Sequence, residues 1–513
     1  MPVNNLINAE TSALIDRTAS AEWGLNPFAL VEAAGRNMAD KLAAFLGTAP
    51  WSTPIVAFIG SGNNGADAMV VIKTLILNHR VYPSDCRLVL NRIPSETEQT
   101  PRSETFKTLA KMNIRFSDFA TWKTTSCDKN AGLIIDGIVG TGLKGQLAGT
   151  AMEMAREINE AKRKASVVVA SIDVPSGLFD EWSADMPIVN ADITLAVEPR
   201  KLCLYKPSAR VFAGNIMSIG GVFPQGLLDT FANRENAELF TWETAKTRIP
   251  KIAPDVHKYQ RGLAEIHAGC VGSAGAARIA AAGAQAVGAG LTRLLVDETL
   301  YPILASAANG IMVAIETNQD DRWKLDAVLL GSGWGNAADR PALFEKTLAR
   351  ATANAATVVL DADAIPLLQM TNLSPVQGTI LTPHVGEFVK FAHTSKEAAL
   401  SNPVPLLKRI AKETRAVILF KSHVLIIADA DGRIGVIDGM MPVLAAGGSG
   451  DLLAGMTVGL AARRVASPFM CAVVAASLLV ESGKAMNTFA DPLELAETVS
   501  KLAFEAWADR DGA

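Results

Sequence analysis

One carboxylate stands among four glycines in the segment LAAGGSGDLLAG, which runs from Leu444 to Gly455. The sequence LLAGMTVGLAARR after Asp451 has helical character, so the glycines bracket the expected start of a helix. Exposed N–H groups at a helix N-terminus favour an anion, and glycines let a phosphate approach the backbone closely. A carboxylate beside a bound phosphoryl group can accept the proton of an attacking hydroxyl. The simpler interpretation is an ordinary first-turn carboxylate, stabilised by the helix dipole by about 0.3–1 kcal/mol.

Three expected strand ends near the amino terminus also carry polar groups. The segment GSGNNGADAMVVIKTL follows an apolar run, IIDGIVGTGLKG presents Asp136, and ASIDVPSGL presents Asp173 and Ser176. The glycines at 60, 62 and 65 precede a helical pattern and suggest phosphate binding at the helix start, although their spacing is not a dinucleotide fingerprint. In a parallel sheet these ends line one crevice, the usual ligand site. The simpler interpretation is a set of strand-to-helix turns, where Asp, Asn, Ser and Gly are common.

The elements that must position these residues are short apolar runs that alternate with helical patterns. Continuous apolarity predicts strands buried on both faces of a parallel sheet, and the alternation predicts a doubly wound α/β layer. The first series of expected strands comprises PIVAFIG, CRLVL, GLIIDGIVG, SVVVASIDVPSG and ADITLAVEP. The second opens near residue 262 and comprises LAEIHAG, TRLLVDE, IMVAIE, DAVLLGSG, ATVVLDADAI and AVILFKSHVLIIADADGRIGVID. Asp431-Gly432 in the last of these predicts a hairpin, and hence antiparallel strands in this half.

A polar, proline-marked junction separates the two series. It runs FPQGLLDTFANRENAELFTWETAKTRIPKIAPDVHK, from Phe223 to Lys258. We therefore expect two α/β domains, residues 1–236 and residues 237–513, with the boundary near Ala237.

Composition limits the classes of partner. The 513 residues include 48 Lys plus Arg and 52 Asp plus Glu, a net charge of −4, which favours small molecules over nucleic acid or a membrane surface. The amino terminus resembles neither a signal nor a transit peptide, so we expect a cytoplasmic protein. The most apolar run, CAVVAASLLV from Cys471 to Val480, is too short for a bilayer, which needs about 20 residues, and predicts a buried helix. The five cysteines lack C-x-x-C spacing, so we expect buried free thiols.

The segment GGSGDLLAG resembles the G-T-G-D turn of the ribokinase-like superfamily, and its companion motifs resemble the ADP- or ATP-dependent NAD(P)H-hydrate dehydratase branch. The companions are HKYQRG at 257, GAGLTRLLV at 288, LLGSGWG at 329, LDADAI at 360, LTPHVGEF at 381 and FKSHVLIIA at 420. The resemblance implies a ribokinase-like α/β domain in which Asp451 is the catalytic base. It implies substrate contacts from His384 and from Gly333 within the Gly331–Gly333 turn. The implied nucleotide contacts are Lys421, Ser422, His423, Val424, Leu425, Gly448, Ser449 and Gly450.

Some of these residues also have simpler interpretations. His384 has turn-favouring neighbours and could cap a turn or a helix. Asp361 and Asp363 end a strand, where we expect them to support the ligand-binding groups, although acids there also cap helices. A lysine that leaves an apolar strand, as Lys421 does, usually extends its amine to solvent.

The amino-terminal motifs, with LVEAAGRNMA at 30 and ADITLAVEPRKLCL at 191, resemble the NAD(P)H-hydrate epimerase domain over roughly residues 5 to 222. The resemblance implies a Rossmann-like doubly wound sheet in which Asp173 handles the proton. It implies a potassium site made by Asn64, Asp136 and Ser176, all oxygen ligands, which a hard cation prefers. The implied substrate contacts are Asn63, Asn64, Gly65, Ala66 and Asp67 in one turn and Gly140, Thr141, Gly142, Leu143, Lys144, Gly145 and Gln146 in one loop.

Together the two resemblances cover almost the whole chain and match the bacterial bifunctional NAD(P)H-hydrate repair enzymes. They imply that one half interconverts the R and S hydrates of NADH or NADPH, and that the other phosphorylates the C6 hydroxyl of the S hydrate, using Mg²⁺ with ADP or ATP, and then eliminates it. A homo-oligomer is also implied. Two other interpretations are a nucleotide-binding protein without turnover, disfavoured by the retained carboxylates and Lys421, and a ribokinase-like small-molecule kinase, disfavoured by the epimerase half.

The chain departs from the family patterns in several motifs, including one in each half. The epimerase pattern N-N-G-G-D-G reads NNGADA, so Ala66 and Ala68 replace glycines, and the dehydratase pattern K-G-x-x-T reads KSHVL, with Leu425 in place of threonine. If either replaced glycine needs a positive φ, the added Cβ costs about 1–2 kcal/mol and crowds the substrate.

Overall fold

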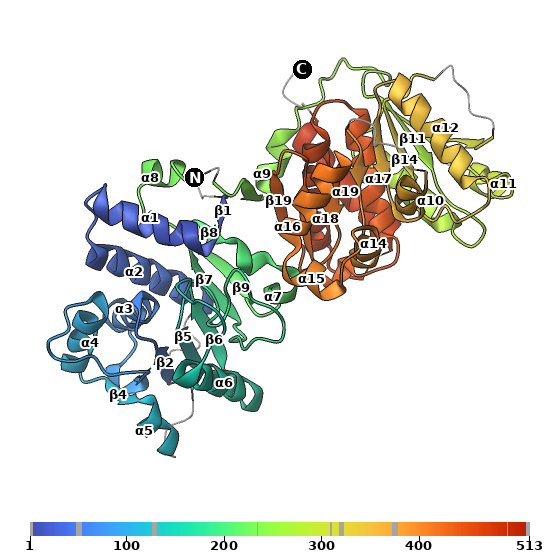
Figure 1. Cartoon of the computed structure of the whole chain (residues 1–513). Helices are drawn as coiled ribbons and strands as arrows, with labels where there is room; N and C mark the ends of the chain where they lie inside the picture. The colour runs from blue at the N-terminus through green and yellow to red at the C-terminus, as the bar shows by residue number, and fades with distance from the viewer. Residues whose placement is uncertain are drawn as a thin grey trace. The chain divides into compact units, whose positions relative to one another are not determined.

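The computed structural model describes residues 4–47, 54–125, 131–232, 234–307, 310–317, 323–371, 378–489 and 491–508. Contacts between Cα atoms divide the chain into two compact units, Met1–Ala237 and Glu238–Ala513. Each unit contains its own large sheet with helices packed against it (Figure 1). Both halves therefore belong to the α/β class, as the alternating pattern predicts.

The first unit is built on a seven-stranded sheet in the order β4-β3-β2-β5-β6-β7-β9. All of its strand pairs are parallel, which confirms the doubly wound prediction. The chain runs from β2 to one edge and returns beside it as β5, so the topological switch point lies between these two strands. The strands are β2 (Ile55–Ile59), β3 (Cys86–Leu90), β4 (Arg115–Asp118), β5 (Leu133–Gly137), β6 (Val168–Ile172), β7 (Ile193–Val197) and β9 (Asn215–Ile219).

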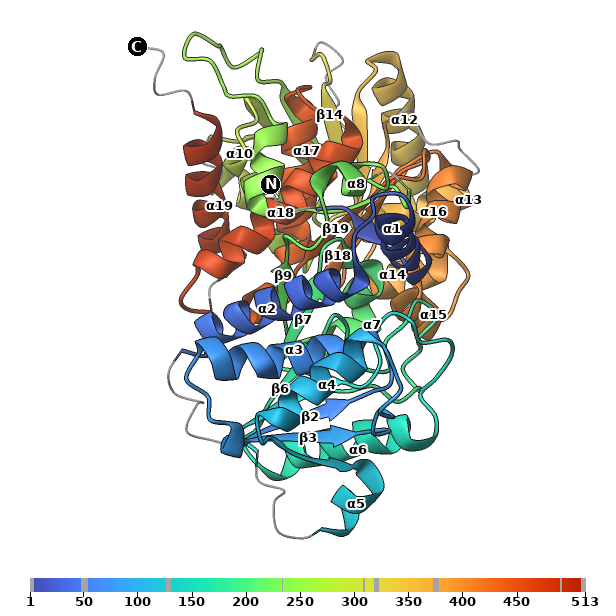
Figure 2. The ribbon, with the colours of Figure 1, turned by 90° about the vertical axis from the view of Figure 1, so that its left-hand side faces the viewer.

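Helices cover both faces of this sheet. Figure 2 shows α2, α3 and α4 on one side of the strands and α6 on the other. Successive residues of β2 serve the two cores: Ala57 packs in one cluster with Met38 and Ile72, and Phe58 packs in another with Met154. The helices are α1 (Ala9–Ala21), α2 (Pro27–Leu46), α3 (Asn63–Asn78), α4 (Pro101–Lys111), α5 (Phe119–Thr124), α6 (Gly149–Lys164), α7 (Pro207–Arg210) and α8 (Gln225–Asp229).

A second, two-stranded sheet in this unit was not predicted. Strand β1 (Leu6–Ile7) pairs in parallel with β8 (Arg200–Lys201), and β8 follows β7 closely in the chain. Helix α1 begins directly after β1, with the Asn8 side chain accepting a hydrogen bond from the Thr11 N–H. This pairing joins the start of the chain to a segment nearly two hundred residues later.

The second unit is built on a ten-stranded sheet in the order β10-β19-β18-β17-β16-β15-β14-β11-β12-β13. The pairs from β13 to β17 are parallel, and β17, β18 and β19 form antiparallel pairs. The hairpin predicted at Asp431-Gly432 is confirmed, with Gly432 at φ 83°. The strands are β10 (Ala237–Leu239), β11 (Leu263–His267), β12 (Leu291–Val296), β13 (Met312–Ile315), β14 (Ala327–Leu330), β15 (Thr357–Leu360), β16 (Ile380–Leu381), β17 (Val417–Phe420), β18 (Val424–Ala428) and β19 (Ile434–Asp438).

Small residues bring helices of the second unit into close contact. A Cβ at Gly455 in α17 would lie 2.0 Å from the carbonyl oxygen of Ala280 in α10, and a Cβ at Gly459 would lie 2.7 Å from Ala284 Cα. Gly455 therefore serves helix packing rather than the anion site. The helices are α9 (Trp242–Ala245), α10 (Ala274–Ala286), α11 (Tyr301–Ser306), α12 (Arg340–Ala353), α13 (Ile365–Met370), α14 (Val385–Phe391), α15 (Lys396–Ser401), α16 (Pro403–Thr414), α17 (Ser449–Ala462), α18 (Pro468–Ala485) and α19 (Pro492–Trp507).

The apolar run Cys471–Val480 lies inside α18, which is longer than the run itself. Within the described part of the chain, this 18-residue helix alone has the length and composition to cross a membrane, so the argument from its short length was wrong. However, 72% of it is buried inside the protein, where it packs in the main core of the second unit. The prediction of a buried helix is confirmed because neighbouring helices and strands cover its apolar surface.

The cysteines that the structure describes are free thiols. Cys86, Cys203 and Cys471 are buried, as expected, and Cys270 is half-buried. Burial raises the pKa of the Cys86 and Cys471 thiols to about 12, so both stay protonated near neutral pH. Cys127 lies outside the described residues.

Candidate functional sites

The glycine-rich turn of the second unit starts a helix, as the sequence predicts. Helix α17 begins at Ser449, and Gly448 precedes it with φ 94°, a conformation that favours glycine. A Cβ at Gly448 would also lie 2.8 Å from Ile279 Cδ1 and 2.8 Å from Pro492 Cγ. Asp451 therefore lies in the first turn, beside N–H groups that point out of the helix end.

Asp361 is the centre of a buried hydrogen-bond network next to this turn. It follows β15 and is only 2% exposed. Its Oδ1 accepts hydrogen bonds from Lys421 Nζ and Thr382 Oγ1, each at 2.7 Å, and its Oδ2 accepts one from Ser332 Oγ at 2.9 Å. Lys421 is therefore ion-paired rather than extended to solvent, and Asp361 makes no side-chain cap. Both simpler interpretations of these residues were wrong, because neither considered a partner from a distant strand.

The electrostatic environment of Asp451 suits a proton acceptor. Its pKa is raised to about 6, chiefly by burial and next by the negative charge of Asp361. The Lys421 ammonium and a hydrogen bond from Ser332 act in the opposite direction, and Glu387 raises the pKa further. A carboxylate with this pKa is mostly ionised at pH 7 and accepts a proton more readily than an ordinary aspartate.

Hydrogen bonds to buried residues fix the turn that carries Gly333. The Gly331 N–H donates to the His267 carbonyl oxygen at 3.2 Å, and Gly331 has φ 119°. Trp334 is fully buried and donates its indole N–H to Glu316 Oε1 at 2.5 Å. Asp363 Oδ2 accepts the N–H of Gly335 at 2.7 Å, which agrees with the predicted supporting role rather than with the helix-cap alternative. The end of β11 and the segments after β13 and β15 therefore hold this turn in place.

His384 caps α14. Its Nδ1 accepts hydrogen bonds from the backbone N–H groups of Gly386 at 2.9 Å and Glu387 at 3.4 Å. The Glu387 carboxylate accepts a hydrogen bond from the backbone N–H of His384 at 2.8 Å. This reciprocal arrangement is a capping box, so the simpler interpretation is confirmed. The side chain is 60% exposed. The cap uses one ring nitrogen, and the substrate contact of His384 stays a prediction.

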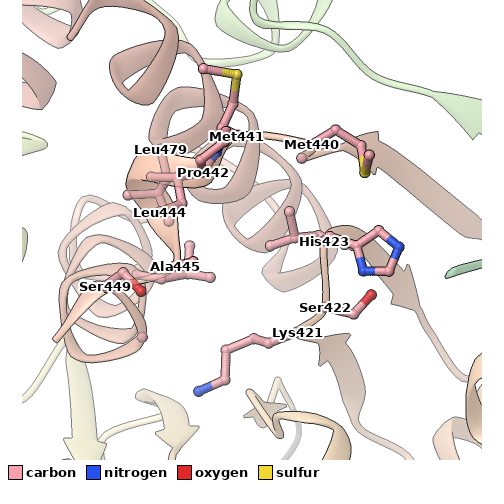
Figure 3. A pocket seen from close by; sticks show the side chains of 14 residues that line it. Lys421, Ser422, His423, Met440, Met441, Pro442, Leu444, Ala445, Ser449 and Leu479 are labelled. Atoms are coloured by element: carbon pink, nitrogen blue, oxygen red, sulfur yellow. The ribbon is translucent and has the colours of Figure 1, made fainter. Parts of the chain in front are cut away.

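A cavity of about 430 Å³ opens beside the α17 turn. Figure 3 shows Lys421, Ser422 and His423 along one side and Met441, Pro442, Leu444 and Leu479 along another. Six of the predicted nucleotide contacts line it: Lys421, Ser422, His423, Leu425, Ser449 and Gly450. Val424 is fully buried in β18, so its side chain cannot contact a ligand there, and Gly448 shapes the turn rather than the cavity wall. Sequence reasoning missed Met440, Met441 and Pro442, which line the cavity just before the glycine-rich motif.

The predicted substrate turn of the first unit is helical. Residues 63–67 form the first turn of α3, which begins after Gly62, so Gly65 lies inside the helix rather than before it. Neither Ala66 nor Ala68 has a positive φ. The predicted backbone cost is therefore absent, because a right-handed helix accepts alanine without strain. The Ala66 side chain is fully buried with Val31 and Val70, which removes it from the surface where substrate could contact it.

Close backbone contacts fix the start of α3 against the sheet. A Cβ at Gly60 would lie 1.7 Å from the Ile138 carbonyl oxygen, and a Cβ at Gly65 would lie 2.5 Å from the Gly60 carbonyl oxygen. These glycines therefore allow α3 and the segment after β5 to meet at the end of β2. The switch point of the sheet lies here, so the helix start and the Gly140–Gln146 loop share one edge.

The three residues predicted to hold potassium lie at this edge. Ser176 Oγ is 2.5 Å from Asp136 Oδ1 and 3.1 Å from the Val139 carbonyl oxygen. A Cβ at Gly140 would lie 2.7 Å from Asn64 Oδ1, so the Asn64 amide reaches the same loop, and its Nδ2 is buried without a hydrogen-bond partner. Burial raises the pKa of the Asp136 carboxyl, and the hydrogen bonds from Ser176 oppose that rise. The donors are all oxygen atoms, which fits a hard monovalent cation.

Asp173 lies at the end of β6 in an unusual backbone conformation. Its φ is 63°, and its side chain is almost buried. Its Oδ1 accepts hydrogen bonds from Lys201 Nζ at 2.7 Å and from the Val197 N–H at 3.1 Å. Strained backbone at a ligand-facing strand end often marks a functional residue.

Asp67 lies near Asp173 and differs from it in its environment. Its Oδ1 is buried without a hydrogen-bond partner. The pKa of Asp67 is raised well above its usual value, first by burial and then by the charges of Asp173 and Asp16, with Lys201 opposing. Sequence reasoning missed Asp16 and Lys201; Lys201 lies within the motif ADITLAVEPRKLCL, whereas nothing in the sequence singled out Asp16.

Comparison with known proteins matches each half of the chain to a family. Residues 264–501 match the NAD(P)H-hydrate dehydratase family, and residues 27–203 match the family described as YjeF-related protein N-terminus. A bifunctional NAD(P)H-hydrate repair enzyme of Salinibacter ruber is 28% identical over 96% of this chain and 94% of its own. One from Gloeobacter violaceus is 29% identical over 86% of this chain and 85% of its own. The ADP/ATP-dependent NAD(P)H-hydrate dehydratase of Bacillus subtilis, crystallised with ATP and Mg²⁺, superposes with a TM-score of 0.47 and 22% identity over 52% of this chain and 98% of its own.

Proposed function

Because the chain belongs to the family of bifunctional NAD(P)H-hydrate repair enzymes, we propose that it restores hydrated NADH and NADPH in two steps. The first unit interconverts the R and S hydrates, and the second dehydrates the S hydrate at the expense of ADP or ATP. The observation that carries the proposal is the position of Asp451. This carboxylate, with a pKa of about 6, lies in the first turn of a helix started by glycines and next to the cavity lined by Lys421.

In the dehydratase step, Asp451 accepts the proton of the C6 hydroxyl as the hydroxyl oxygen attacks the terminal phosphorus of the nucleotide. The bond from that phosphorus to its bridging oxygen breaks, which releases AMP from ADP or ADP from ATP. The N–H groups at the start of α17 and the Lys421 ammonium stabilise the negative charge that develops on the phosphoryl oxygens. The C6–O bond of the phosphate ester then breaks as a proton leaves C5 for solvent. Inorganic phosphate is released, and the dihydropyridine ring is restored.

The apolar side of the cavity suits the nucleotide base. Met441, Pro442, Leu444 and Leu479 line it opposite Lys421, so a planar apolar group and a charged group meet opposite walls (Figure 3). Leu425, which replaces the threonine of the family pattern, adds to this apolar lining. Apolar contacts therefore position the nucleotide base, and the charge of Lys421 positions the phosphates.

Magnesium belongs to this proposal as the partner of the nucleotide. No group of three or more His, Cys, Asp or Glu side chains with metal-binding geometry occurs among the described residues. Proteins usually hold Mg²⁺ through one or two carboxylates together with substrate phosphates. When bound, the ion would neutralise charge on the phosphates.

In the epimerase step, the two carboxyl groups have different roles. Asp67, whose pKa is raised, donates a proton to the C6 hydroxyl, the C6–O bond breaks, and water leaves with the ring nitrogen supplying electrons to C6. Water then adds to the opposite face, and its surplus proton passes to Asp173. The reverse direction exchanges the two roles, so protons balance over each interconversion.

Potassium would be held by Asn64, Asp136 and Ser176, whose oxygen atoms fit it. When bound, it would supply positive charge at the edge where the Gly140–Gln146 loop meets α3. Of the other predicted contacts, Asn63, Asn64, Gly65 and Asp67 lie in the first turn of α3. A cytoplasmic location, a homo-oligomer and the absence of nucleic-acid and membrane partners remain predictions.

The experiment that tests this proposal follows absorbance at 340 nm as the full chain meets a mixture of R and S hydrates of NADH with Mg²⁺ and ADP or ATP. We expect full recovery of NADH, release of inorganic phosphate, and loss of recovery in Asp451→Asn. Asp431→Asn, in the hairpin turn, is the matched control and should behave as the unmodified chain. Recovery that stops at the S fraction would refute the epimerase half. No recovery with either nucleotide would refute the dehydratase half, and a stable phosphorylated product would indicate a kinase instead.

A further inference from the structure

Lys201 is a buried lysine for which the mechanism above has no role. It is 3% exposed, although a lysine ammonium is costly to remove from water. Its Nζ donates to Asp173 Oδ1 at 2.7 Å and to the Val197 carbonyl oxygen at 3.2 Å. A buried charge destabilises a protein unless a partner of opposite charge compensates it. The ion pair with Asp173 therefore allows Lys201 to be buried.

The unpredicted two-stranded sheet places this lysine. Lys201 lies in β8, where it is paired in register with Ile7 of β1. Helix α1 follows β1 and carries Asp16, which interacts electrostatically with both Lys201 and Asp173. Asp67 of α3 interacts with the same three residues. Lys201 is thus the cation in a cluster that contains three carboxyl groups from three different elements.

The hydrogen bonds of Asp173 distinguish its two oxygens. Among the described residues, both donors to this carboxylate, Lys201 Nζ and the Val197 N–H, reach Oδ1. Within the described part of the chain no protein group donates to Oδ2, which is left for a ligand. Two donors on one oxygen fix the plane of the carboxylate, and the positive φ of Asp173 sets the direction from which it extends.

We propose that Lys201 is a positioning residue of the epimerase site, which holds Asp173 Oδ1 so that Oδ2 exchanges the proton with the hydrate. Lys201 itself does not touch the substrate. Its hydrogen bond to Oδ1, together with that of the Val197 N–H, prevents the carboxylate from turning. This inference rests on the proposed epimerase activity of the first unit.

The test measures epimerisation alone, without nucleotide. Pure S hydrate of NADH is incubated with the full chain, and the appearance of R hydrate is followed by chromatography. We expect Lys201→Met to lower kcat by about 100-fold with little change in KM, because general acid–base contributions of this size are typical and no substrate contact is lost. Lys201→Arg, which keeps the cation, should recover most of the rate. In a chain that also carries Asp173→Asn, Lys201→Met should cause no further loss, because the lysine acts through that carboxylate.

A matched control separates positioning from folding. Lys206 is also a largely buried lysine of the first unit, but its Nζ donates to the Asp180 carbonyl oxygen and not to Asp173. Lys206→Met should leave kcat of epimerisation within about 2-fold, and dehydration of S hydrate with nucleotide should stay unchanged in both variants. An unaltered kcat in Lys201→Met, or a further loss when Asp173→Asn is already present, would overturn the positioning role. Absence of epimerisation in the unmodified chain would instead overturn the proposed function.

Discussion

Lys421 and Asp361 form a largely buried ion pair, with Nζ 2.7 Å from Oδ1 and side-chain exposures of 16% and 2%. They lie sixty positions apart in the chain, at the ends of β17 and β15. The pair joins the nucleotide cavity, which Lys421 lines, to the turn that carries Asp451, whose pKa both residues influence. In the proposed mechanism, one contact therefore couples phosphate binding to the proton affinity of Asp451.

Removing one member of this pair should be costly. Lys421→Met leaves Asp361 buried without its cation, which we expect to lower the free energy of unfolding by about 3–5 kcal/mol. The double variant Lys421→Met with Asp361→Asn should recover most of that stability but no activity, because the cavity still lacks its ammonium. Urea unfolding followed by circular dichroism measures the stability of the single and the double variant. Equal stability of the single and double variants would argue against a stabilising pair.

The pH dependence of dehydration should report Asp451. With a pKa of about 6, its ionised form falls as pH drops through 6, so kcat should decline on that side of a pH profile measured with saturating S hydrate and nucleotide. The Lys421 ammonium lowers this pKa, so the profile of Lys421→Met should move to higher pH where residual activity permits measurement. A profile that stays flat down to pH 5 would exclude Asp451 as the titrating base.

The raised pKa of Asp451 also makes folding stability depend on pH. Because Asp451 binds its proton more tightly in the folded than in the unfolded state, folding stability is lost as pH rises from about 3.8 to about 6. Asp451→Asn removes this charge and should stabilise the second unit at pH 8 by up to about 3 kcal/mol. Near pH 3.5 the variant and the unmodified chain should unfold alike. Urea unfolding at the two pH values compares them, and an equal gain at both would attribute the effect to packing.

Two adjacent glycines of the α17 turn should respond differently to alanine. At Gly448 a Cβ meets a positive φ and atoms of Ile279 and Pro492, whereas at Gly447 nothing lies within 4 Å. We expect Gly448→Ala to cost about 1–2 kcal/mol or more and to weaken nucleotide binding strongly. Gly447→Ala should change both by little. Thermal unfolding and calorimetric titration with ADP and Mg²⁺ test this, and equal effects would contradict the assigned conformation.

Restoring the family glycines in α3 should not improve the epimerase. Ala66 and Ala68 are helical and fully buried, so each change to glycine should cost about 1 kcal/mol of stability through backbone entropy and lost packing. The epimerisation rate should not rise. If Ala66→Gly or Ala68→Gly increased that rate tenfold, the alanine side chains would have to be crowding the substrate after all. Rates from pure S hydrate and melting temperatures decide between these outcomes.

The sequence alone determined the class of the fold and much of the chemistry. Continuous apolar runs identified the strands that form the centres of both sheets, because strands buried on both faces consist mostly of apolar residues. The glycines before Asp451 identified a helix start, since Gly448 occupies a conformation that other residues avoid. The family resemblance then supplied roles for residues such as Lys421 and Asp173, whose types alone permit many functions.

Only the tertiary structure decided which side chains meet. The Lys421–Asp361 pair, the Lys201–Asp173 pair and the cavity wall at Met440–Leu444 depend on strand order and on the pairing of β1 with β8. Short strands such as β1, β8 and β16 lack a periodic signal because two residues cannot display one. Long-range pairing also reversed the local expectation for Lys421, which favoured solvent. Local sequence encodes what a residue can do, and the contacts that raise a pKa or hold a carboxylate come from elements far apart in the chain.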